Sequence, residues 1–162
     1  MTSSPENCWK VIITNSSKLV FMAEEISLNN QVIWIEGAKG EIAFPSGERL
    51  EFALPAKFGG VEGFPSPEDV FVAAANACLL TTTIARAKKY DVVLRSYRSE
   101  AVGVLEKVGE GREITKIEIK VRLKADGDPE TLLDMFADVA GKVPVIKSMS
   151  TSVNIDFEVD QE

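Results

Sequence analysis

The sequence contains no histidine, and this absence removes several classes of active site. There can be no Ser-His-Asp triad, no Cys-His pair and no histidine metal ligand. The two cysteines, Cys8 and Cys78, are 70 positions apart, so no CxxC pair is available for zinc binding or redox cycling. We therefore expect no metal and no cofactor.

The sequence also lacks signals for nucleotides, nucleic acids and membranes. Neither GxGxxG nor GxxxxGK[ST] occurs, and the net charge of −7 disfavours nucleic acid and anionic membrane as partners. No stretch reaches the roughly 20 apolar residues of a membrane span. The first residues, MTSSPENCWK, lack the basic and apolar regions of a signal peptide. We expect one soluble cytoplasmic domain over residues 1–162, with residues 1–10 as a flexible tail.

A long apolar segment begins at Phe64 and reads FPSPEDVFVAAANACLLTTT. Ser66 can cap a helix, Pro67 suits its first position, and Asp69 completes a capping box. No further proline or glycine occurs before Tyr90, so we expect one helix of roughly 35 Å. Because this helix is apolar on every face, it is predicted to be buried at the centre of the fold.

Cys78 lies in the middle of this predicted helix, and two interpretations stay open. It is either a small core residue or a reactive thiol held in a dry pocket. A free thiol has a pKa of about 8.5, burial raises that pKa, and the helix dipole fades within the first turn. A neighbouring cation is therefore needed if the thiol is to ionise readily.

Short segments that favour strands lie on both sides of the helix. They are Val11–Thr14, Lys18–Ala23, Gln31–Glu36, Glu41–Phe44, Arg49–Leu54, Val92–Glu106, Thr115–Lys124 and Ser152–Val159. In Thr115–Lys124 apolar and charged residues alternate, which predicts one core face and one solvent face in an antiparallel sheet. Glu110-Gly111 is a hairpin signal before it.

Two more helices are expected near the C-terminal end. One runs from Asp128-Pro129 to about Gly141, and a short one runs from Pro144 to about Met149. The apolar stripe of the first is predicted to be Leu132, Leu133, Phe136, Val139 and Ala140. Strands, helix, strands, helices and strand in this order predict an α+β fold.

Three motifs together have a recognisable arrangement. Gly59-Gly60 precedes the helix start Pro65-Ser66-Pro67-Glu68-Asp69, Ala77-Cys78 falls ten residues after Glu68, and Val143-Pro144-Val145-Ile146-Lys147-Ser148 follows later. They resemble the glycine loop, the (S/N)-P-E-E/Q helix start, the glutamate-to-cysteine spacing and the Cys-Pro-Val segment of the OsmC/Ohr family. These are the osmotically induced and organic hydroperoxide resistance proteins. The likeness covers residues from about 31 to 158.

The resemblance implies an intertwined homodimer in which antiparallel sheets wrap around two long central helices. It also implies reduction of organic hydroperoxides, in which a reactive cysteine becomes a sulfenic acid. A second cysteine then forms a disulfide, and an external dithiol restores the enzyme. By this likeness, Cys78 is the thiol that attacks the peroxide and Glu68 is the carboxylate that orients a catalytic arginine.

The sequence departs from the family pattern at two positions. Val143 stands where the family has its resolving cysteine, so that step cannot occur in the family's way. The family's arginine has no clear match, and the nearest cations are Lys39 and Arg49. Cys8 can resolve a sulfenic acid only if the N-terminal arm folds over the site.

Glu68 and Cys78 are separated by about 15 Å along a continuous helix. Glu68 can therefore approach a thiol only from a second chain, unless the helix breaks.

These observations leave two main hypotheses for function. The first is reduction of organic hydroperoxides by Cys78 alone, with an external thiol as reductant. The alternative is a catalytically degenerate dimer of the same fold that binds a small apolar or lipid-like molecule. A third reading is a purely structural protein. Sulfenic acid formation at Cys78 distinguishes the first hypothesis from the other two.

Overall fold

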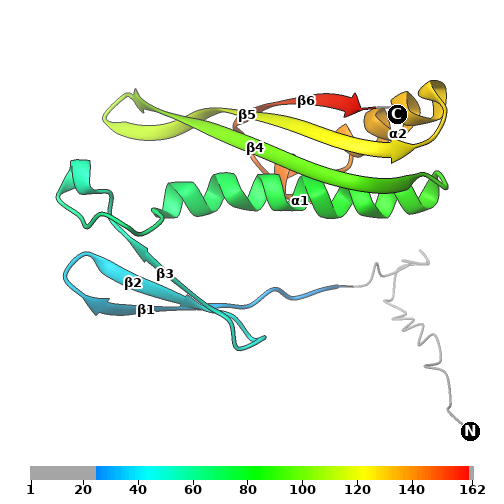
Figure 1. The fold of residues 1–162 in the computed structure, drawn as a ribbon. Coiled ribbons are helices and arrows are strands. Elements are labelled where there is room, and N and C mark those ends of the chain that lie inside the picture. The colour runs from blue at the N-terminus through cyan, green and yellow to red at the C-terminus, as the bar shows by residue number, and fades with distance from the viewer. Residues whose placement is uncertain (1–24, 161–162) are drawn as a thin grey trace, which may run out of the picture.

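The computed structural model describes residues 25–160, in which one long helix lies between two three-stranded sheets (Figure 1). The elements in chain order are β1 (Gln31–Glu36), β2 (Lys39–Ala43), β3 (Arg49–Ala53), the 3-10 helix η1 (Ala56–Phe58), α1 (Pro67–Lys89), β4 (Val93–Val108), β5 (Gly111–Asp126), α2 (Pro129–Ala140), α3 (Pro144–Lys147) and β6 (Ser152–Asp160). The α+β class is confirmed. The predicted strands Val11–Thr14 and Lys18–Ala23 lie outside the described residues.

The second sheet has the order β4-β5-β6 and differs from the sequence prediction in two ways. The antiparallel pair β4 and β5 continues to the register pair Val108 and Gly111, so both strands are longer than expected. β6 pairs with β5 in parallel, which makes the sheet mixed rather than antiparallel. The parallel pairing follows because α2 and α3 form a crossover between β5 and β6.

The core lies between α1 and the inner face of the second sheet. The alternation predicted for β5 is confirmed, since its apolar residues from Ile117 onward are at most 8% exposed. These residues are Ile117, Ile119, Val121, Leu123 and Ala125. Ring stacking of Phe136 on Phe157, with centroids 4.5 Å apart, attaches α2 to β6. The second sheet and the helices therefore share one hydrophobic core.

Only one side of α1 is buried within the chain, so a single chain leaves part of this apolar helix uncovered. Its buried residues are Ala75, Leu79, Thr82, Thr83 and Ala87. We use the name outer face for the exposed residues on the opposite side, which are Ala73, Ala74, Ala77, Thr81, Ile84 and Ala85. This face is rich in small and apolar side chains and is open to solvent in the single chain.

The prediction that no segment is long and apolar enough to span a membrane is wrong for α1. An 18-residue window of this helix has a mean hydropathy of 1.5, and 28% of the window is buried. A core helix of a globular fold passes the same test. The polar capping box at its start and the charged residues Arg86, Lys88 and Lys89 in its last turn are typical of a helix with ends in water.

The first sheet also has an exposed apolar face. Val32, Ile42 and Leu50 are register partners, as are Trp34, Gly40 and Phe52. Partners across a sheet point to the same side. The apolar face of the first sheet therefore consists of Val32, Trp34, Ile42, Leu50 and Phe52. Val32 and Trp34 are 64% and 74% exposed, so nothing in the described part of the chain covers this face fully.

A cluster of charges joins the end of α1 to α2. Asp138 lies 3.0 Å from Lys89 Nζ, 2.8 Å from Lys142 Nζ and 3.6 Å from Arg86 Nη1. Hydrogen bonds from Lys142 and Lys89 lower the pKa of Asp138 to about 2. The carboxylate thus holds together three cations that would otherwise repel one another.

Asp138→Asn is expected to destabilise the protein at neutral pH. Because the pKa of Asp138 is lower in the folded state, its contribution is complete above about pH 4 and is lost as the pH falls toward 2. Urea midpoints of the two proteins should therefore converge in acid. Asp134→Asn, at an exposed aspartate of the same helix, is the control. A constant difference down to pH 2 would contradict the assignment.

Candidate functional site

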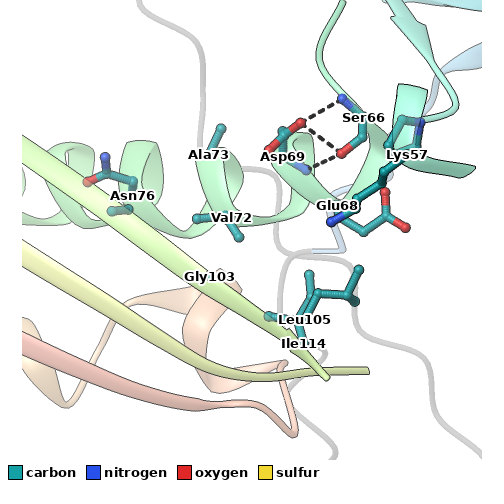
Figure 2. Close-up of a pocket in the computed structure, with 12 residues that line it drawn as sticks. Lys57, Ser66, Glu68, Asp69, Val72, Ala73, Asn76, Gly103, Leu105 and Ile114 are labelled. Atoms are coloured by element: carbon teal, nitrogen blue, oxygen red, sulfur yellow. Dashed lines mark hydrogen bonds between the residues drawn. The ribbon is translucent and has the colours of Figure 1, made fainter. Parts of the chain in front are cut away.

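The start of α1 is fixed by the capping box that the sequence predicts. The Asp69 amide donates to Ser66 Oγ at 3.1 Å, and the Ser66 amide donates to Asp69 Oδ2 at 2.8 Å (Figure 2). The Ser66 amide and the Ser66 hydroxyl both donate to the Asp69 carboxylate, and these two bonds hold the pKa of the Asp69 carboxyl below its usual range. Pro67 occupies the first turn. The cap fixes the direction in which the next side chain, Glu68, leaves the helix.

Glu68 borders a cavity of about 400 Å³ between the start of α1 and strand β4 (Figure 2). Its Oε2 atom is buried and has no hydrogen-bond partner among the described residues. The other lining residues come from η1, α1, β4, β5 and the loops between them. They are Pro55, Lys57, Ser66, Asp69, Val72, Ala73, Asn76, Ala101, Gly103, Leu105 and Ile114. We call this cavity the Glu68 pocket.

Contacts between α1 and β4 fix one wall of the Glu68 pocket. Ser99 Oγ donates to Asn76 Oδ1 at 2.6 Å. A Cβ atom at Gly103 would lie 2.5 Å from Val72 Cγ2, so a glycine allows β4 to approach the helix here. No local pattern in the sequence marks Asn76, Ser99 or Gly103 as site residues, because the pairing of α1 with β4 arises from tertiary packing.

Cys78 is half-buried on α1 and points away from the Glu68 pocket. Side chains two positions apart on a helix point about 200° apart around its axis. Cys78 therefore lies on the flank opposite to Asn76, which faces β4. Cys78 packs against the core cluster that includes the fully buried Val143. Thr81 Oγ1 donates to the Cys78 carbonyl at 3.0 Å, so this hydroxyl bonds the helix backbone rather than the thiol.

The structure does not bring the two predicted site residues together within one chain. Ten residues separate Glu68 from Cys78, which is about 2.8 helical turns and about 15 Å. α1 is continuous over this distance. In residues 25–160, no hydrogen bond or ion pair involves the Cys78 sulfur.

The two candidate cations belong to the first sheet and are paired there. Lys39 Nζ lies 2.8 Å from Glu36 Oε1 and 5.5 Å from the centroid of the Phe64 ring. Arg49 pairs with Glu41. Among the described residues, neither Lys39 nor Arg49 forms an interaction with Cys78 of the same chain. Cys8 lies outside the described residues.

No group of three or more histidine, cysteine or acidic side chains is positioned to hold a metal in the part of the chain that the structure describes. The acidic residues near the pocket, Glu68 and Asp69, point to different partners. Asp69 bonds to Ser66, whereas Glu68 faces the cavity.

Comparison with known families now assigns the fold. The sequence profile of the family described as OsmC-like protein matches residues 60–158. The chain belongs to the OsmC-like family. The match begins at Gly60 and includes the helix start, Cys78 and the segment from Val143 to Ser148, which confirms the resemblance seen in the sequence.

Solved OsmC-like structures have the same fold at low sequence identity. An OsmC-like protein of unknown function from Vibrio cholerae is 20% identical, with a TM-score of 0.72, over 84% of this chain and 100% of that chain. An organic hydroperoxide resistance protein from Elizabethkingia anophelis is 16% identical, with a TM-score of 0.65, over 87% and 100%.

A third similar structure is an organic hydroperoxide resistance protein OsmC from Legionella pneumophila. It is 18% identical, with a TM-score of 0.64, and the match covers 86% of this chain and 100% of that chain. The comparison with curated proteins finds no match. These likenesses show an OsmC-like fold over 84–87% of this chain.

Proposed function

We propose that this OsmC-like protein reduces organic hydroperoxides at Cys78 as a dimer of two chains. The observation that carries the proposal is the position of Cys78 on α1. The thiol is half-buried, and Ala74 and Ala85, which lie on the same side of the helix, are exposed. Cys78 therefore lies at the border between the core and the outer face of α1. In the dimer described below, a hydroperoxide would reach the thiol along the edge of the covered outer face.

The dimer is supported by two apolar faces that do not cover each other in one chain. The outer face of α1 is open, and so is the apolar face of the first sheet. The first sheet lies apart from α1 in Figure 1. Apolar surface of this extent favours association. We place the apolar face of one chain's first sheet on the outer face of the second chain's α1.

Single substitutions on β1 test this arrangement. Val32→Glu places a charge on the apolar face and is expected to weaken dimerisation about 100-fold or more, because burying an unpaired charge costs several kcal/mol. Ile33→Glu, at the next residue on the opposite face, is the matched control. Light scattering measures the mass. A monomeric wild-type protein at micromolar concentration would rule out the dimer.

The chemistry requires only one cysteine of the protein. The Cys78 thiol attacks the peroxide, the O–O bond breaks, and the products are a Cys78 sulfenic acid and the alcohol. Two molecules of an external thiol then reduce the sulfenic acid, which releases water and the external disulfide. Because Val143 replaces a second cysteine and is fully buried, no disulfide can form inside the core.

The position of the cations predicts a slow reaction. Arg49 pairs in register with Ala43, so it points away from the apolar face of the first sheet. A second chain that covers α1 with this face would hold Arg49 on the far side. Without an adjacent cation only a few per cent of a thiol is ionised at neutral pH.

Treatment with cumene hydroperoxide followed by mass spectrometry tests the reaction. We expect a sulfenic acid on Cys78 and consumption of peroxide in the presence of an external dithiol. Cys78→Ser should abolish both, and Cys8→Ser, which removes the other cysteine, should leave sulfenic acid formation unchanged. An unmodified Cys78 at millimolar hydroperoxide would eliminate the enzymatic function.

As a second candidate function, we propose that the Glu68 pocket binds a small, largely apolar molecule. The supporting observation is the combination of a cavity of about 400 Å³ with a buried Glu68 oxygen that no described residue bonds. Small-molecule sites are typically apolar cavities of this size with a few polar groups. This function does not depend on Cys78, which points to the other flank of α1.

A further inference from the structure

The Glu68 pocket has one polar atom that needs a hydrogen-bond donor. Glu68 Oε2 is buried, and no described residue donates to it. A buried acceptor without a donor costs free energy that a ligand can recover. Glu68 extends from the first turn of α1 beside Lys57 and above Leu105 and Ile114 (Figure 2).

The neighbouring charged side chains already have other partners. Lys57 Nζ lies 5.1 Å from the centroid of the Phe58 ring, and Arg112 lies 5.0 Å from the same ring. Both cations therefore interact with the aromatic ring. Asp69 is held by Ser66. Glu68 is thus the carboxylate of the lining that remains available to a ligand.

One part of the wall is suited to hydrocarbon, whereas the part next to Glu68 is polar and includes Lys57, Ser66, Asp69 and Asn76. Val72 of α1, Ala101 and Leu105 of β4, and Ile114 of β5 line the cavity. β4 approaches α1 so closely at Gly103 that a Cβ atom there would lie 2.5 Å from Val72 Cγ2, so the space between these two residues admits no ligand. A short alkyl chain can instead lie against Ala101, Leu105 and Ile114 while its polar end reaches Glu68.

We propose that the Glu68 pocket binds a small amphiphile with a protonated amine head and a short apolar tail, held by Glu68 through the ammonium group. This inference rests on the second proposed function and specifies its ligand. An ammonium group supplies both a donor and the opposite charge, and charge-assisted hydrogen bonds are about twice as strong as neutral ones. An alcohol of the same length supplies only the donor.

Titration calorimetry with three probes of equal chain length tests the proposal. Octylamine carries the ammonium head, octan-1-ol a neutral donor, and octanoate a negative charge. We expect octylamine to bind at least 10-fold more tightly than octan-1-ol, and octanoate to bind most weakly. Glu68→Gln should weaken octylamine binding about 10- to 100-fold and change octan-1-ol binding little. Glu62→Gln, at an exposed loop carboxylate near the helix, is the matched control.

A second variant tests whether the apolar tail of the ligand lies in the Glu68 pocket. Ala101→Leu narrows the cavity and is expected to weaken octylamine and octan-1-ol alike. Circular dichroism of each variant confirms that the fold is retained. Unchanged octylamine binding in Ala101→Leu would place the amine elsewhere and overturn the inference.

The remaining outcomes separate this inference from the function on which it rests. Equal binding of octylamine and octan-1-ol, unaffected by Glu68→Gln, would overturn the ammonium preference and leave the apolar binding function intact. Tighter binding of octanoate would also overturn it and would indicate recognition by Lys57. Absence of binding by all three probes would overturn both the inference and the binding function.

Discussion

Leu132→Ala is expected to lower the free energy of unfolding by about 2–5 kcal/mol, the range for large-to-small changes in a packed core. Leu132 is 2% exposed and belongs to the cluster formed by α1, α2 and β5. Its side chain lies beside Gly127 and close to Val92, and a Cβ atom on Gly127 would be 3.4 Å from both. Truncation would leave a cavity that these fixed neighbours cannot fill.

The adjacent leucine provides a matched control for this measurement. Leu133 is 69% exposed, so Leu133→Ala should change the free energy of unfolding by less than about 0.5 kcal/mol. Both variants can be compared by urea denaturation under identical conditions. Equal effects would show that Leu132 is not packed in the core.

Gly60→Ala is expected to cost more than about 3 kcal/mol, beyond the usual range for overpacking. A Cβ atom at Gly60 would lie 1.5 Å from the Leu54 carbonyl oxygen. That oxygen is part of the backbone and accepts a hydrogen bond from Val61 at 3.1 Å, so no change of rotamer can relieve the clash. The loop would have to move away from the end of β3.

This loop leads to the helix start, so the effect of Gly60→Ala should extend to the Glu68 pocket. Gly111→Ala is the control, because a Cβ atom there would meet only the Val108 carbonyl oxygen at 3.9 Å, an ordinary contact distance. Thermal denaturation and hydrogen exchange of the amides in residues 54–66 would report the difference. A Gly60→Ala protein as stable as the Gly111→Ala protein would refute the close approach.

The helices and strands that are marked by a local sequence pattern could be predicted from the sequence. The capping box of Ser66 and Asp69 fixed the start of α1 correctly, and alternation along β5 identified its buried face. The apolar stripe of α2 was predicted only in part. Leu133 and Ala140, which were predicted to belong to the stripe, are exposed, and Met135 is fully buried. The helix period places Leu132, Met135 and Val139 on one side.

Features that depend on distant parts of the chain could not be predicted in this way. The parallel pairing of β6 with β5, and the glycine contact between β4 and α1 at Gly103, arise from tertiary packing. The separation of Cys78 from the Glu68 pocket arises in the same way. The spacing in the sequence predicts the distance between Glu68 and Cys78 along the helix. It does not predict which flank of the helix faces β4, which the contact between Asn76 and Ser99 fixes.

The parallel pairing of β5 with β6 has a consequence for how the chain matures. β6 closes one side of the second sheet and brings Phe157 onto Phe136. A nascent polypeptide can form the β4–β5 hairpin early, since its partners are close in sequence, but it cannot complete the sheet until the ribosome has synthesised Asp160. Until β6 has been synthesised, one edge of β5 lacks its partner strand and Phe136 lacks the ring on which it stacks.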